Sequence, residues 1–110
     1  DRHKASVIAK VRAACVERDG YCRIAQRWLT NGTVEQYEIG CDGPTQWTHL
    51  PPKTRAHTIN LPPEERHGTA WTMMTCQRHH DMIDGRQQPR IVVRCLTPDG
   101  ADGPISVEVA

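Results

Sequence analysis

The sequence predicts a single small α+β domain that spans residues 1–110, and two observations predict this fold class. A chain of 110 residues is long enough for one modest hydrophobic core, which at this size often gains stability from a bound metal ion. Stretches with helical periodicity are also interspersed with short stretches of strand periodicity. Eight prolines and eight glycines, with no phenylalanine, indicate a fold rich in loops.

The first half predicts a helix followed by a β-hairpin. The helix is expected over residues 6–16, capped by Ser6 and ended by Asp19-Gly20, with Cys15 buried on its apolar stripe. Residues 23–39 read as a hairpin that turns at Asn31-Gly32. Such a hairpin brings Cys22 and Cys41 together at its base.

The second half predicts two further strand pairs and one short helix. Residues 46–50 and 70–75 are expected to be strands, separated by a loop over residues 51–69 whose length is itself a functional signal. A short helix then ends near Gly85. Residues 91–96 and 105–109 form a C-terminal hairpin in which Ile91, Val93 and Cys95 share one face.

The stretch from Thr75 to Gly85 carries most of the candidate chemistry. Cys76 and His79 stand three residues apart, a spacing by which one helical turn presents two ligands to one zinc ion. His80 points in a different direction and shares its face with Asp84, four residues later. The spacing therefore predicts two sites on one helix, a structural zinc site and a second cation site.

The cysteine count favours metal binding over a disulfide framework. Five cysteines are an odd number, and a histidine stands at ligand spacing beside one of them. This predicts a reducing, cytoplasmic location, in a bacterium or as a phage-encoded protein. A secreted disulfide protein remains an alternative, which thiol counting would detect. No stretch of the sequence is apolar enough for a membrane span.

Together these residues resemble the ββα-metal core of the HNH endonucleases. The likeness runs from Arg18 to Gly85. It rests on Arg18-Asp19-Gly20-Tyr21-Cys22, on a strand that ends with His49, on the long loop, and on the helix that opens on Cys76-Gln77-Arg78-His79-His80. It implies a zinc-stapled, treble-clef-like core of about residues 18–85. The implied zinc ligands are Cys22, Cys41, Cys76 and His79.

The resemblance also implies a metal-dependent DNA endonuclease. His49 matches the general base, and His80, with Asp84, matches the site of a catalytic magnesium or manganese ion. Thr48 stands where the family has an aspartate or histidine ligand. Trp71 stands where an asparagine that orients the base is expected, and His67, Asn60 or Thr69 can replace it from the loop.

The expected partner is DNA. The net charge of +1 gives no global signal for nucleic acid, so phosphate contacts are assigned to local basic residues. These are Lys53, Arg55, Arg78 and Arg86. The alternative function is a catalytically inactive zinc-binding module that binds nucleic acid or a protein partner.

Overall fold

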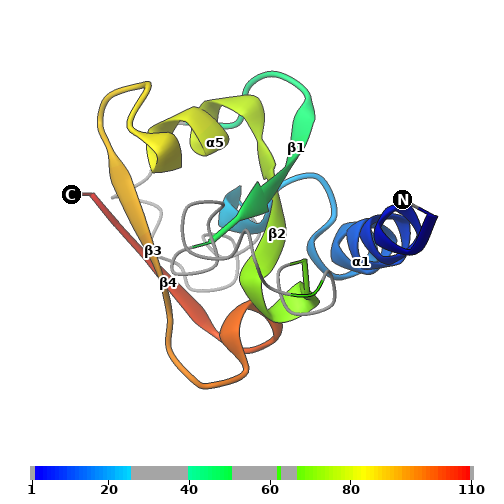
Figure 1. Ribbon diagram of the computed structural model, residues 1–110. Coiled ribbons are helices and arrows are strands. Elements are labelled where there is room, and N and C mark those ends of the chain that lie inside the picture. Colours follow the sequence, from blue (N-terminus) through cyan, green and yellow to red (C-terminus); the bar gives the residue numbers. More distant parts are fainter. Residues whose placement is uncertain (1, 26–39, 51–61, 63–66, 110) are drawn as a thin grey trace.

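The structure is a computed structural model that describes residues 2–25, 40–50, 62 and 67–109. Within these residues it shows an N-terminal helix, two β-hairpins and one short helix, with two single-turn 3₁₀ helices (Figure 1). The elements are α1 (Arg2–Asp19), β1 (Thr45–His49), η2 (Thr69–Trp71), β2 (Thr72–Cys76), α5 (Gln77–Asp84), β3 (Ile91–Cys95), η3 (Gly100–Asp102) and β4 (Ile105–Val109). The predicted α+β class is confirmed at this level.

Helix α1 is longer than the sequence predicts. It begins at Arg2, so Ser6 lies inside the helix and does not cap it. Its C-terminal end agrees with the prediction, because Gly20 adopts a left-handed φ of 66° and donates its N–H to the Val16 carbonyl at 2.8 Å. Only glycine adopts this conformation without steric strain. Cys15 is fully buried, as predicted.

Strands β1 and β2 form an antiparallel hairpin that leads directly into α5. Their register places Thr45 opposite Cys76 and His49 opposite Thr72. β1 begins and ends one residue before the predicted strand over residues 46–50. β2 begins two residues after the predicted start at residue 70, because residues 69–71 form η2. The Leu50 N–H bonds to the Trp71 carbonyl at 2.8 Å and continues the pairing past the strand end.

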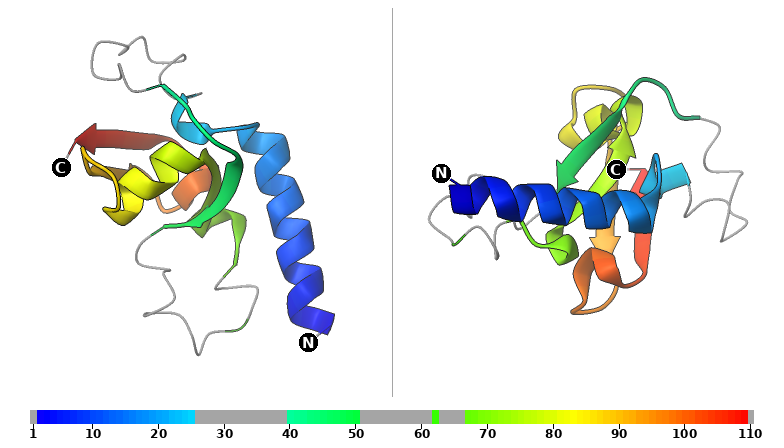
Figure 2. Two further views of the ribbon diagram at one scale, coloured as in Figure 1. Left: turned by 90° about the horizontal axis from the view of Figure 1, so that it is seen from above. Right: turned by 90° about the vertical axis from the view of Figure 1, so that its right-hand side faces the viewer.

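The two faces of this hairpin meet different helices, α1 on one side and α5 on the other (Figure 2). Thr48 faces α5, where its hydroxyl lies 3.0 Å from Nδ1 of His80. Thr72 faces α1, where its hydroxyl lies 3.3 Å from the Cys15 sulfur. Because side chains opposite each other in an antiparallel pair share a face, His49 lies on the α1 side.

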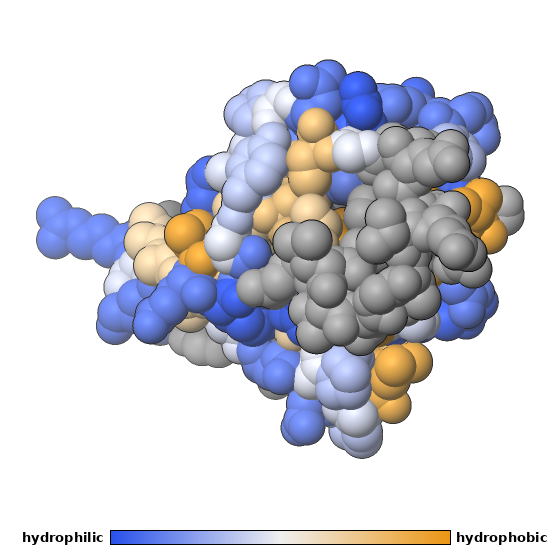
Figure 3. Space-filling model, turned by 180° about the vertical axis from the view of Figure 1, so that it is seen from behind, coloured by the Kyte–Doolittle hydropathy of each residue, from blue (hydrophilic) through white to orange (hydrophobic). Residues whose placement is uncertain are grey.

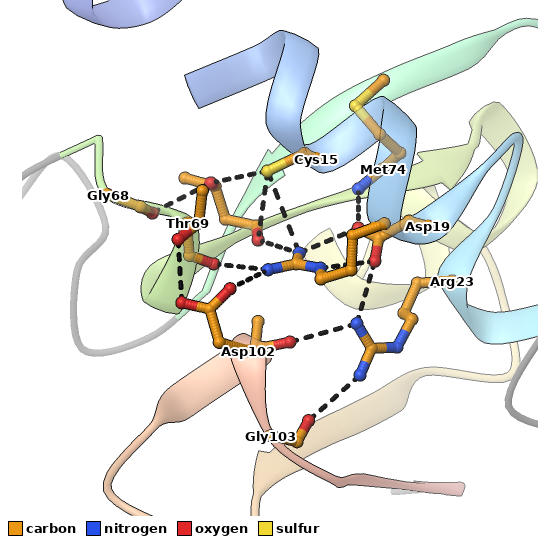
Figure 4. A network of polar contacts seen from close by, with 11 residues as sticks. Cys15, Asp19, Arg23, Gly68, Thr69, Met74, Asp102 and Gly103 are labelled. Carbon is orange, nitrogen blue, oxygen red and sulfur yellow. Dashed lines mark hydrogen bonds and ion pairs between the residues drawn. The ribbon is translucent and has the colours of Figure 1, made fainter. Parts of the chain in front are cut away.

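A buried carboxylate fastens α1 to the rest of the fold. Asp19 is 2% exposed and accepts hydrogen bonds from Arg18, from Arg23 and from the Met74 N–H (Figure 4). Burial alone would raise the pKa of Asp19, but these bonds outweigh it and lower the pKa. The two guanidinium groups also bond to the η2 and η3 segments, through the carbonyls of Thr69, Thr72, Ala101 and Gly103 and the carboxylate of Asp102.

The C-terminal hairpin completes the core. β3 pairs with β4 in the register Ile91 to Val109 through Cys95 to Ile105, and α5 lies between the two hairpins (Figure 1). Residues 91–95 show the predicted alternation, with Val93 and Cys95 packed against the core and Arg94 exposed. The buried core residues are Cys22, Ile24, Leu50, Met73, Cys76, Met82, Ile91, Ala101, Ile105 and Val107.

The predicted hairpin over residues 23–39 can be compared with the structure only at residues 23–25. Residues 23–25 are helical, so its first strand does not begin there. Arg23 is instead held by Asp19 and by the carbonyls of Ala101 and Gly103. The turn at residues 31–32 and the rest of this prediction lie outside the described residues. Most of the predicted loop over residues 51–69, with Asn60, lies outside them as well.

Candidate metal centre and adjoining histidines

Four segments converge to bring three cysteines and one histidine together. Cys22 follows the turn that ends α1, and Cys41 lies in the segment before β1. Cys76 is the last residue of β2, and His79 lies in the first turn of α5. Their ligand atoms all lie within 4.8 Å of one another. The predicted proximity of Cys22 and Cys41, which are far apart in sequence, is therefore confirmed.

The distances in this cluster suit a tetrahedral metal ion. Nδ1 of His79 lies 3.1 Å from the Cys76 sulfur, 3.4 Å from that of Cys22 and 3.8 Å from that of Cys41. Zinc bonds of about 2.3 Å to sulfur and 2.0–2.1 Å to nitrogen place neighbouring ligand atoms about 3.6 Å apart. The cluster is therefore compatible with a structural zinc ion held by three thiolates and one imidazole.

The surroundings also suit a closed, structural site. Cys76 and His79 are fully buried and Cys22 is 4% exposed, while Cys41 is partly exposed. Burial raises the pKa of Cys22, and burial together with the neighbouring thiols raises that of Cys41. Without a cation these thiols stay protonated at neutral pH, so metal binding has to displace protons. All five cysteines are free thiols.

Local interactions help to position three of the four ligands, Cys41, Cys76 and His79. The Cys76 sulfur accepts the His79 N–H at 3.4 Å and caps α5. The Arg78 N–H bonds to the Asp42 carbonyl, and its guanidinium contacts the Gly40 carbonyl and the Asp42 carboxylate. Arg78, which the sequence assigns to DNA binding, therefore holds the Cys41 segment against α5.

Gly43 allows this close approach. Its φ of 82° is left-handed, and a Cβ atom there would lie 2.6 Å from Cβ of Gln77. A side chain at this position is therefore excluded both by backbone conformation and by contact with α5.

His80 lies on the other side of α5 from His79, as the sequence predicts, and both of its ring nitrogens have partners. Nδ1 lies 3.0 Å from the Thr48 hydroxyl, which in turn lies 2.8 Å from the hydroxyl of Thr75. Nε2 lies 3.3 Å from the Asp84 carboxylate. The i, i+4 spacing in the sequence predicts the contact between His80 and Asp84. The sequence contains no signal for the contribution of Thr75.

His49 and His67 form a histidine pair on the α1 side of the hairpin, opposite the side that faces His80. Nε2 of His49 lies 2.8 Å from Nδ1 of His67. The ring of Trp47 lies beside both, with centroid distances of 4.7 Å and 5.6 Å. His67 is 6% exposed although it lies in the predicted loop over residues 51–69. Two of the three candidates for the missing asparagine, His67 and Thr69, are among the described residues, and of these two His67 is the one that contacts His49.

The structure thus groups the sequence-derived candidates into three clusters, the four zinc ligands, His80 with Asp84, and His49 with His67. Arg86 is exposed after the end of α5, where its N–H bonds to the Asp81 carbonyl. Lys53 and Arg55 lie outside the described residues. Among the described residues, the Cys₃His cluster is the one group of three or more potential metal ligands. No helix in the described part is long and apolar enough to cross a membrane.

Comparisons with protein-family models, curated proteins and solved structures gave no match. The functional interpretation therefore depends on the residues and geometry of this chain.

Proposed function

We propose that the chain is a zinc-stapled DNA endonuclease of the HNH type, which hydrolyses phosphodiester bonds with the help of a divalent cation. The observation that carries the proposal is the path of the chain from β1 through β2 into α5. This ββα path sets His49 at the end of the first strand and His80 on the helix. It also directs Thr48, the residue before His49, onto the His80 ring at 3.0 Å.

In this proposal the Cys₃His cluster has a structural role. It joins the end of α1, the Cys41 segment, β2 and α5, and three of its four ligands are almost fully buried. A closed set of four protein ligands leaves no position for water or substrate, which is typical of structural zinc sites. The zinc ion would stabilise the hairpin and helix that carry the histidines.

His49 is the proposed general base, and His67 is its positioning residue. If the Nε2–H of His49 donates to Nδ1 of His67 at 2.8 Å, the lone pair of His49 is on Nδ1. That atom then takes the proton from the attacking water as the oxygen of the water bonds to phosphorus. Trp47 packs against both rings and restricts their orientation. In this proposal His67 orients the base, the role of the family's asparagine at the position where this chain has Trp71.

His80 and Asp84 are the proposed holders of the divalent cation, magnesium or manganese. Nε2 of His80 and a carboxylate oxygen of Asp84 lie 3.3 Å apart, close to the spacing of about 3.0 Å between adjacent ligands around a magnesium ion. When bound, the cation would supply charge to the scissile phosphate and to the leaving oxygen. Thr48 fixes the ring by its contact with Nδ1, and it adds no negative charge.

Two observations favour the second candidate, a zinc module without catalysis. His49 lies on the α1 face of the hairpin, whereas Thr48 and His80 meet on the α5 face, so the proposed base and the proposed cation site do not share one face. Thr48 occupies the position from which a carboxylate or imidazole would complete the cation site. Among the described residues no third histidine, cysteine or acidic side chain joins His80 and Asp84. Such a module would bind nucleic acid or a protein through the same fold.

Nicking of supercoiled plasmid with added magnesium or manganese tests the proposal. His49→Ala should lower the nicking rate by about a hundred- to ten-thousand-fold, the usual contribution of a general base, while zinc content and circular dichroism stay unchanged. His80→Ala should raise the cation concentration needed for half-maximal rate.

Two results would contradict the proposal. Equal nicking by His49→Ala and the parent would exclude the role of His49. No nicking by the zinc-loaded parent at any concentration of either cation would favour the non-catalytic module. His67→Asn should retain more activity than His67→Ala, because an amide oxygen can still accept the hydrogen bond of His49.

A further inference from the structure

The basic charge of the chain is concentrated in the first part of α1. Residues 2–16 contain four lysines and arginines and no aspartate or glutamate, although the whole chain has a net charge of only +1. The four are Arg2, Lys4, Lys10 and Arg12, and all are exposed. None of the phosphate contacts predicted from the sequence lies on this helix.

Three of these four cations, Arg2, Lys10 and Arg12, have no visible role in holding the described part of the fold together. Arg2, Lys10 and Arg12 make no hydrogen bond or ion pair with another described residue. The first turn of α1 contains no acidic residue, so Arg2 and Lys4 lie at the positive end of the helix dipole, where a cation is unfavourable.

Two contacts of α1 show where its N-terminal part lies relative to the hairpin. Cys15 touches Thr72, which lies opposite His49 at the end of the β1–β2 hairpin. Further along α1, Asp19 touches Met74, closer to the zinc cluster. The residues before Cys15 therefore run past the hairpin end that carries His49, and on the same face. Arg2 lies about 20 Å ahead of Cys15 along the helix.

The figures agree with this placement. The N-terminal end of α1 stands out from the body of the molecule (Figure 2). At the left of Figure 3 this end forms a hydrophilic projection. Arg12, Arg2 and Lys10 fall within an arc of about 160° around the helix, at 100° per residue. At the same angle per residue, Arg2 and Lys10 lie about 140° from Cys15 and point away from its stripe, whereas Arg12 lies about 60° from Cys15, at the edge of that stripe.

We infer that the N-terminal part of α1 is a phosphate-binding arm that holds duplex DNA beside the hairpin end that carries His49. A row of cations with no acidic side chain among residues 2–16 complements the phosphate backbone, and a helix of about 20 Å faces roughly a dozen phosphate charges of a duplex. The arm positions the duplex and reads no sequence, because phosphate contacts carry no base information. This inference rests on the proposed function only for the choice of DNA as the polyanion.

The test is the salt dependence of duplex binding, measured by fluorescence anisotropy on the zinc-loaded full chain without added magnesium or manganese. The variant is Lys10→Gln with Arg12→Gln. Its matched control is Arg90→Gln with Arg94→Gln, which removes the same charge from exposed positions around β3. Each lost phosphate contact should reduce the slope of log K against log salt by about 0.9. The α1 variant should therefore lose about 1.8 in slope and bind tens of times more weakly at 0.1 M salt.

The outcomes separate this inference from the proposed function. The inference holds if the α1 variant loses slope and affinity while the control retains both, whether or not the parent nicks plasmid. It is overturned if both variants change equally, or if the parent does not bind duplex at all. It is also overturned if sedimentation shows a dimer that the α1 variant disrupts while duplex binding is unchanged, because the arm would then be a contact between two copies.

Discussion

Replacing Asp19 with asparagine should destabilise the fold more than any other change of a single carboxylate among the described residues. The Asp19 side chain is fully buried, and the side chains of Arg18 and Arg23 are 21% and 14% exposed. Its two oxygens accept four hydrogen bonds, from Arg18 twice, from Arg23 and from the Met74 N–H. Asparagine has the same shape but directs an NH₂ group at these donors.

The expected magnitude follows from burial and from the partners that remain. Removing one member of a buried ion pair usually costs about 3–5 kcal/mol. Both arginines retain carbonyl acceptors in the η2 and η3 segments and are partly exposed, which favours the lower end. A loss of about 3 kcal/mol is therefore expected, a large part of the 5–15 kcal/mol that stabilises a typical domain.

Urea unfolding of the zinc-saturated protein measures this loss. The matched control is Asp102→Asn, because Asp102 also pairs with Arg18 but its side chain is 45% exposed. The control should lose less than about 1 kcal/mol. Equal losses in the two variants, or a loss below 1 kcal/mol for Asp19→Asn, would refute the assignment of Asp19 as the central fastening of α1.

The lowered pKa of Asp19 gives the same prediction a pH dependence. A carboxylate whose pKa is lowered by folding stabilises the protein above its unfolded pKa of about 3.9, and this contribution disappears as the pH falls through the folded pKa. The stability difference between the parent and Asp19→Asn should therefore be constant at about pH 5–7 and shrink below about pH 4. A difference that grows on acidification would contradict this.

Three further predictions concern the metal sites. Cys41→Ser should lower the melting temperature far more than Cys15→Ser, since only Cys41 belongs to the zinc cluster; similar losses would count against the cluster. Gly43→Ala should lower zinc affinity and stability, because its Cβ atom would lie 2.6 Å from Gln77. Zinc affinity is measured by competition with a chelator. Gly40→Ala is the control, because a Cβ atom there meets nothing within 4 Å. Thr48→Asp should raise nicking and lower the magnesium requirement, because it adds a carboxylate beside His80; no change in either would place the cation elsewhere.

Local patterns in the sequence were sufficient to predict the elements that surround the site. The Cys-x-x-His spacing and Gly85 define α5, because the cap at Cys76 and the left-handed glycine at 85 are local features. The strand pairs follow from alternation to within two residues. The sequence does not predict the extension of α1 to Arg2, because the first turn of the helix is polar and exposed.

Tertiary contacts were the part that local patterns could not supply. No spacing rule connects Thr75 to Thr48 and His80, or His67 to His49, because each contact joins residues brought together only by the hairpin register. No local pattern indicates that Arg78, whose assignment to phosphate binding stays a prediction, also fastens the Cys41 segment. Arg23 was placed in a strand although Asp19 holds it in a helical turn.

The account depends most directly on the metal content of the Cys₃His cluster. Elemental analysis of protein purified without chelator should give about one zinc ion per chain, tightly held. Zinc should be lost from His79→Ala and retained by His80→Ala. Native thiol counting should find Cys22, Cys41 and Cys76 unreactive until the metal is removed. A folded, metal-free protein, or zinc content that His79→Ala leaves unchanged, would contradict the central claim.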